Sequence, residues 1–133
     1  MNSIKSRYFS IAAQLNAPAL FIRFATTPQH DGSAHVEQQG DNYCYVVTER
    51  GIELDRRKTK DIDVILYWLI SELTWDMASD YELRHRVVNQ DSRRQLFAKH
   101  LELLAKVKIE WSQRKSAEYD QILKEHPFID KAE

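Results

Sequence analysis

The sequence predicts an α+β domain: a small antiparallel sheet of about three to four strands, with one helix before it and three helices after it. Between Tyr43 and Arg57, apolar and polar residues alternate, as they do in half-buried strands. From Asp61 onward, apolar residues recur at helical spacing, and Pro127 is the only proline in that part of the chain. Because strands and helices are segregated along the chain, we expect the helices to cover one face of the sheet.

The composition is that of an ordinary globular protein, with 43% hydrophobic and 29% charged residues. Its 133 residues suit a single domain over 1–133. The net charge of -1 argues against a nucleic-acid partner, since nucleic-acid-binding domains usually carry a basic excess. One cysteine excludes an intrachain disulfide and fits a reducing cytoplasm, and the longest apolar run, residues 64–70, is too short to span a bilayer. We therefore expect a soluble cytoplasmic protein with no membrane partner.

The first part of the chain begins with a predicted amphipathic helix over residues 3–16. Its apolar positions share helical spacing: Ile4, Tyr8, Ile11, Ala12 and Leu15. Asn16-Ala17-Pro18 ends this helix. The apolar run at residues 19–24 is typical of a strand, residues 26–33 form a polar loop, and residues 35–38 suggest a weak strand.

A β-hairpin over residues 43–48 and 52–57 is the clearest strand signal, with Glu49-Arg50-Gly51 as its turn. The remainder predicts three helices, near residues 60–87, 91–107 and 110–125. There is no internal repeat and no low-complexity tract in the sequence.

The first of these helices carries an apolar stripe that runs into charged residues. The stripe consists of Ile62, Leu66, Leu69, Ile70, Leu73 and Met77. Continued at about 100° per residue, it passes through Asp80 and Arg84, which are four residues apart and therefore able to pair. A buried charge must be paired, so we expect a buried Asp80–Arg84 ion pair that Arg93 also reaches, with Asp91 capping the next helix. Removing one member of such a pair should cost about 3–5 kcal/mol.

The same helix has a second apolar face, made of Val64, Tyr67, Trp68, Ser71, Trp75 and Ala78. It leads toward Glu82 and Arg86, which serve either packing or a partner. A helix that is apolar on two sides is usually sandwiched between other elements. An alternative is that Trp68 and Trp75, with His85 nearby, form the pocket of a small enzyme or ligand-binding domain.

The sequence shows no pattern typical of a catalytic, cofactor or metal site. Its three glycines lie in turn contexts, and its five histidines show no recognised ligand spacing. The predicted strand position of Cys44 favours packing over nucleophilic chemistry. We therefore predict neither an enzyme nor a cofactor. A second alternative, a nucleic-acid adaptor, would use the basic residues Arg56, Arg57, Arg93 and Arg94.

Four segments resemble the immunity protein 63 family of bacterial polymorphic toxin systems. They are YVVTERG, ILYWLISELTWDMASDYELRHR, NQDSRRQLFAKHLELLAKVKIEW and ILKEHPF, between Tyr43 and Phe128. The most distinctive pieces are Tyr67-Trp68, residues 81–86, Asp91 with Arg93-Arg94, and residues 126–128. The first 42 residues carry no part of this resemblance.

The resemblance implies a cytoplasmic antidote encoded after its toxin gene. Such a protein binds the toxic C-terminal domain of a toxin delivered by contact-dependent inhibition or a related secretion system. Protection comes from stoichiometric binding without substrate turnover, and a nuclease is the favoured toxin activity. Because nuclease active sites tend to be basic, acidic side chains are the candidate toxin contacts. These are Glu49, Glu53 and Asp55 on the hairpin and Glu72, Asp76 and Glu82 on the long helix.

Overall fold

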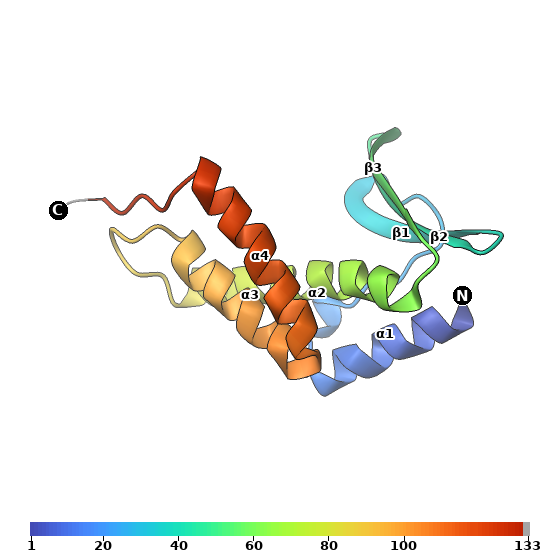
Figure 1. Ribbon diagram of the computed structural model, residues 1–133, viewed down its shortest axis with the longest axis horizontal. Helices are drawn as coiled ribbons and strands as arrows, with labels where there is room; N and C mark the ends of the chain where they lie inside the picture. Colours follow the sequence, from blue (N-terminus) through green and yellow to red (C-terminus); the bar gives the residue numbers. More distant parts are fainter. Residues whose placement is uncertain (132–133) are drawn as a thin grey trace. The chain divides into compact units, whose positions relative to one another are not determined.

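The computed structural model describes residues 1–131. In this part of the chain the order of elements is α1, β1, β2, β3, α2, α3 and α4, with a short 3-10 helix, η1, between α1 and β1 (Figure 1). This confirms the predicted α+β fold class, with a three-stranded antiparallel sheet, one N-terminal helix and three C-terminal helices. The contacts divide the chain into two compact units, one ending at Glu72 and the other beginning at Leu73. Helix α2 contributes to both.

Helix α1, Asn2–Gln14, confirms the predicted first helix and buries Ile4, Tyr8 and Ala12 on one face. The Tyr8 hydroxyl accepts a hydrogen bond from the backbone N–H of Arg23 at 3.0 Å. Its ring also contacts Phe24, with ring centroids 5.8 Å apart. These contacts attach the segment after α1 to the helix that precedes it.

The strand predicted over residues 19–24 is wrong. Residues Ala19–Phe21 form the 3-10 helix η1, in which the N–H of Phe21 bonds to the carbonyl of Pro18 at 3.0 Å. Proline has a fixed φ that suits the start of a turn. Residues 19–24 are not a strand of the sheet, and the hydrogen bond to the sheet comes just after them, from the N–H of Val36 to the carbonyl of Ala25 at 2.9 Å. Leu20, in the middle of this run, is exposed.

The sheet is a meander of β1 (Asp31–Gln39), β2 (Asn42–Glu49) and β3 (Ile52–Thr59). The predicted hairpin is confirmed. Arg50 and Gly51 connect its strands with positive φ values of 51° and 80°, as a tight two-residue turn requires. Strand β1 is longer than the predicted weak strand and begins inside the predicted loop, because pairing with β2 extends to Asp31 opposite Glu49.

The strands differ in how far they are buried. Cys44, Tyr45 and Val46 of β2 are all buried, and since successive side chains point to opposite faces, both faces of β2 are covered. Tyr45 packs on Trp68 of α2 and donates a hydrogen bond from its hydroxyl to Glu72 at 2.8 Å. Strand β3 has no buried residue and forms an edge of the sheet.

Helix α2, Ile62–Arg84, is shorter than the predicted 60–87. Its central residues are buried around most of the circumference, including Leu66, Tyr67, Ile70 and Thr74. This agrees with the prediction of a helix that is covered on two sides. Because α2 ends at Arg84, Val87 and Val88 belong to the following loop and are exposed.

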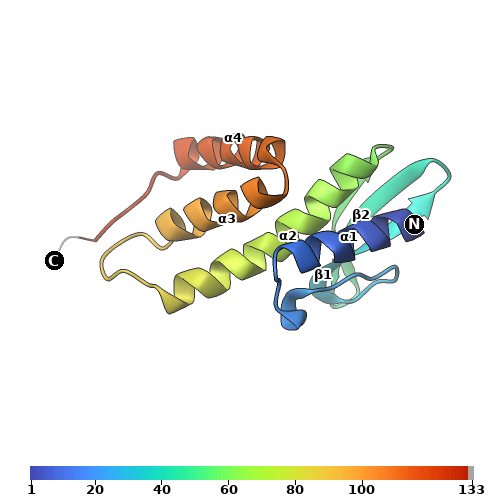
Figure 2. The same ribbon diagram turned by 90° about the horizontal axis from the view of Figure 1, so that it is seen from below.

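In the second unit, α3 (Arg93–Val107) and α4 (Ile109–Glu125) lie side by side (Figure 2). The rings of Phe97 and Tyr119 stack between them, with centroids 3.8 Å apart. His100 is buried beside this pair. One ring nitrogen is hydrogen-bonded to the Tyr119 hydroxyl and the other to Thr74 Oγ1 at 2.8 Å. These contacts join α3 and α4 to the second half of α2.

Over the described residues, none of the helices combines the length and the apolar character needed to cross a bilayer.

Candidate functional site

The predicted burial of the Asp80–Arg84 pair is wrong. Arg84 Nε donates to Asp80 at 3.0 Å, but the two side chains are 72% and 37% exposed. Arg93 pairs with Asp91 at 2.9 Å instead of reaching Asp80. The apolar stripe of α2 therefore does not continue as a buried stripe through Asp80 and Arg84.

The buried carboxylate at this end of α2 is Glu82, whose side chain is only 6% exposed. It lies one turn after the fully buried Ala78, on the second apolar face of the helix. Arg86 binds both of its oxygens, through Nε at 3.1 Å and Nη2 at 2.7 Å. These hydrogen bonds lower the pKa of Glu82 and keep it ionised. Glu82 thus holds the guanidinium of Arg86 in a fixed place.

Asp91 was predicted to be a helix cap and nothing more, but it has a larger role. It accepts the backbone N–H of Arg93 at 3.0 Å, in the first turn of α3, and the backbone N–H of Ile129 at 2.9 Å. The guanidinium of Arg93 binds the same carboxylate and also donates to the carbonyls of His126 and Pro127, at 2.9 and 2.8 Å. These interactions hold the pKa of Asp91 well below its usual range.

Further contacts fasten the C-terminal segment, residues 126–131. Arg94 Nε donates to Asp130 at 3.0 Å, and Asp130 accepts the backbone N–H of Asp91 at 2.8 Å. The guanidinium of Arg94 also lies over the Phe128 ring, 4.3 Å from its centroid. In the sequence, Arg93-Arg94 and residues 126–128 stand out only as separate pieces. No sequence pattern predicted that they bind each other or that Asp130 takes part.

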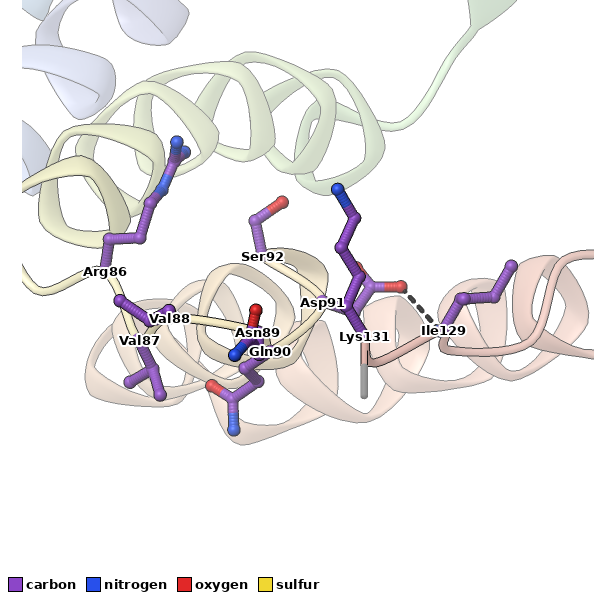
Figure 3. Close-up of a pocket in the computed structure, with 9 residues that line it drawn as sticks. All are labelled: Arg86, Val87, Val88, Asn89, Gln90, Asp91, Ser92, Ile129 and Lys131. Carbon is purple, nitrogen blue, oxygen red and sulfur yellow. Dashed lines mark hydrogen bonds between the residues drawn. The ribbon is translucent and has the colours of Figure 1, made fainter. Parts of the chain in front are cut away.

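A hollow of about 410 Å³ lies where the C-terminal segment meets the loop after α2 (Figure 3). We call it the loop–tail hollow. Its walls come from residues 86–92 on one side and from Ile129 and Lys131 on the other. Figure 3 shows the hydrogen bond between Asp91 and Ile129 that joins the two sides.

The six predicted toxin contacts have different surroundings in the described structure. Glu53 is paired with Arg56 and Asp55 with Arg57, each at 2.7 Å. Glu72 accepts the Tyr45 hydroxyl, and Glu82 is occupied by Arg86 as described above. Glu49 is exposed at the end of β2, and Asp76 is half-buried on α2. Four of the six carboxylates therefore already interact with a neighbouring side chain of this protein.

Trp68, Trp75 and His85 each pack on other side chains. Trp68 packs on Tyr45 in the first unit, whereas Trp75 packs on Phe97 and His100 in the second. His85 stacks on Tyr81 and donates from Nδ1 to the carbonyl of the same residue at 2.9 Å. None of the three lines the loop–tail hollow, nor a second hollow near Phe9 and Phe24.

Comparison with known families gives one match, to the model of immunity protein 63, over residues 39–121. The matched range begins at the end of β1 and ends inside α4, so it includes the Glu82–Arg86 and Asp91–Arg93 pairs. Comparisons with curated proteins and with solved structures found no match. Because the family model covers more than half of the 133 residues, the chain belongs to the immunity protein 63 family.

Proposed function

We propose that this protein is the cytoplasmic antidote of a polymorphic or contact-dependent-inhibition toxin. It binds the toxic C-terminal domain one to one and neutralises it without turning over a substrate. The family match over residues 39–121 carries this proposal, because membership supports an immunity function. We further propose that the toxin domain is a nuclease.

The surface of the second unit supports a protein as the partner. Several large apolar side chains are exposed there, among them Leu83, Val87, Val88 and Ile129. Exposed apolar groups that lie together and are surrounded by polar residues are typical of protein-binding surfaces. Binding through such groups neutralises a toxin only if the complex outlasts the toxin's encounters with its substrate, so we expect a dissociation constant in the nanomolar range, about -12 kcal/mol.

The proposal is tested with the C-terminal domain of the large secreted protein encoded immediately upstream of this gene. Calorimetric titration should give a one-to-one complex, and expression of this protein should restore growth to cells that produce the toxin domain. Absence of binding, together with absence of protection, would contradict the proposal.

The nuclease assignment has its own test. The purified toxin domain should degrade RNA or DNA, and one molar equivalent of this protein should stop the reaction. A toxin domain that leaves both nucleic acids intact, yet is neutralised, would refute the nuclease assignment and keep the antidote function.

A further inference from the structure

The loop–tail hollow exposes apolar side chains to an unusual degree. Val88 is 82% exposed and Ile129 is 73% exposed, and both line the hollow together with Val87. Side chains of this kind gain most from burial, at about 25 cal/mol for each Å² of apolar surface removed from water. A partner that covers them would recover this energy.

The backbone that carries these side chains is fixed on both sides of the hollow. The N–H of Lys131 bonds to the carbonyl of Asn89 at 2.9 Å, and the N–H of Ile129 bonds to Asp91 at 2.9 Å. Asn89 itself has a positive φ of 64°, a conformation that few residues other than glycine adopt. Because the loop and the C-terminal segment hold each other, a partner loses little free energy in ordering them.

Arg86 adds a directed polar group to this surface. Its Nε and Nη2 are used by Glu82, while Nη1 makes no hydrogen bond to any of the residues that the structure describes. The side chain is 58% exposed and lines the hollow beside Val87. A guanidinium held in place by a buried carboxylate presents two N–H donors in a fixed direction, which suits a carboxylate acceptor.

The carboxylates at this site offer little competing negative charge. Glu82 is buried under Arg86, and the Asp91 side chain is 11% exposed and bound to Arg93. Asp130, beside the hollow, is paired with Arg94 at 3.0 Å. The exposed charges on the wall of the hollow are therefore the cations of Arg86 and Lys131, which lie beside the apolar groups.

We propose that the loop–tail hollow is the docking surface for the toxin domain. The element that it binds is a patch of the toxin that carries a carboxylate flanked by apolar side chains. This inference rests on the proposed function and makes it more specific. It also replaces the predicted acidic interface, because a cationic and apolar surface does not imitate the phosphates of a nucleic acid. In this proposal, the antidote binds the toxin at an acidic side chain.

The first experiment compares charged substitutions at one highly exposed position by calorimetric titration with the upstream-encoded toxin domain. Val88→Asp should weaken binding about 30-fold or more, the size of a hot-spot effect, because it adds a like charge and removes an apolar contact. Val88→Lys should weaken binding less, since its ammonium faces the toxin carboxylate. Leu20→Asp and Leu54→Asp, at exposed aliphatic positions of the first unit, are the matched controls and should bind within about 2-fold of the wild type.

The second experiment separates Arg86 from Arg84, which forms a pair of the same spacing on the exposed side of α2. Arg86→Lys keeps the charge but loses the two-pronged contact with Glu82, so binding should weaken about 10-fold. Arg84→Lys should change it less than about 2-fold. Thermal unfolding of each variant shows whether the fold is intact, so that a loss of binding is assigned to the interface.

Two results would overturn the inference in distinguishable ways. If the wild type binds the toxin domain tightly, and Val88→Asp and Arg86→Lys bind equally well, the docking surface lies elsewhere and the antidote function stands. An equal loss of affinity for Val88→Asp and Val88→Lys would contradict the proposal that a toxin carboxylate faces the hollow. If the wild type does not bind at all, the proposed function fails and the docking surface fails with it.

Discussion

Two ion pairs at the end of α2 have the same spacing in sequence and different surroundings. Asp80–Arg84 and Glu82–Arg86 each join a carboxylate to a guanidinium four residues later. The Asp80 side chain is 37% exposed, whereas that of Glu82 is 6% exposed. Residues two apart on a helix point in nearly opposite directions, so the two pairs occupy opposite sides of the last turns.

This difference shows that sequence spacing predicts which residues pair, but not how much the pair contributes to stability. An exposed pair has its charges in water on both sides, and its net contribution to stability is small. A carboxylate that is buried depends on its partner, because without it the charge would be left in an apolar setting. Four substitutions and one change of pH test this contrast, in order of decreasing expected effect.

Ala78→Asp should have the largest effect. Ala78 is fully buried one turn before Glu82, and an added carboxylate there would have no guanidinium at the matching position. We expect a loss of more than about 4 kcal/mol in the free energy of unfolding, measured by urea denaturation. Leu83→Asp is the control, because Leu83 directly follows Glu82 on α2 and is exposed. Its free energy of unfolding should stay within about 0.5 kcal/mol of the wild type. Equal losses at the two positions would contradict the assignment of faces.

Glu82→Ala should come next, with a loss of about 1.5–3 kcal/mol, the range for hydrogen bonds to charged groups. This loss is smaller than the loss expected for a fully buried pair. Arg86 is half-exposed, so water can solvate its guanidinium when Glu82 is removed. Urea denaturation measures the change. A loss below about 0.5 kcal/mol would mean that Glu82 contributes as little to stability as the exposed Asp80–Arg84 pair.

Acid should weaken the fold through the same group. Hydrogen bonds from Arg86 lower the pKa of Glu82 in the folded state, so its ionised form stabilises the protein above its unfolded pKa of about 4. That stability is lost as the pH falls through about 4 toward the lower, folded pKa. We expect the melting temperature to drop on acidification, and to drop less in Glu82→Gln. Identical pH profiles would contradict this assignment.

Arg93→Ala should act locally. It removes the hydrogen bonds to the carbonyls of His126 and Pro127, and it removes the cation paired with Asp91. The C-terminal segment should loosen, so the backbone amides of Ile129 and Lys131 should exchange with solvent about 10-fold faster or more. Amides in the middle of α2 are the internal control and should keep their rates. Unchanged exchange at Ile129 would mean that Asp91 alone holds the segment.

Asp80→Ala should have the smallest effect, within about 0.5 kcal/mol of the wild type by urea denaturation. Burial of this pair would have required about 3–5 kcal/mol, so the two interpretations differ clearly. A loss of several kcal/mol in the free energy of unfolding would show that the exposed pair stabilises the fold after all.

Local sequence patterns were enough to predict the fold class and most of the helices and strands. Alternation over residues 43–57 predicted β2 and β3, and helical spacing predicted α1 and the three later helices. These signals are local, because one buried face imposes a period of two or of 3.6 residues. The error at residues 19–24 has the same origin: an apolar run marks a strand only if a neighbouring strand pairs with it.

Which charged side chains are buried depended on how the elements pack, and local patterns did not predict it. Helical spacing placed Asp80 and Glu82 on two possible core faces, and the packing of the second unit buried one and left the other in water. The contacts of Asp91 and Arg93 with residues 126–131 join positions more than thirty residues apart, and no local pattern records such pairings. Periodicity describes a helix alone, whereas burial is set by the elements that pack against it.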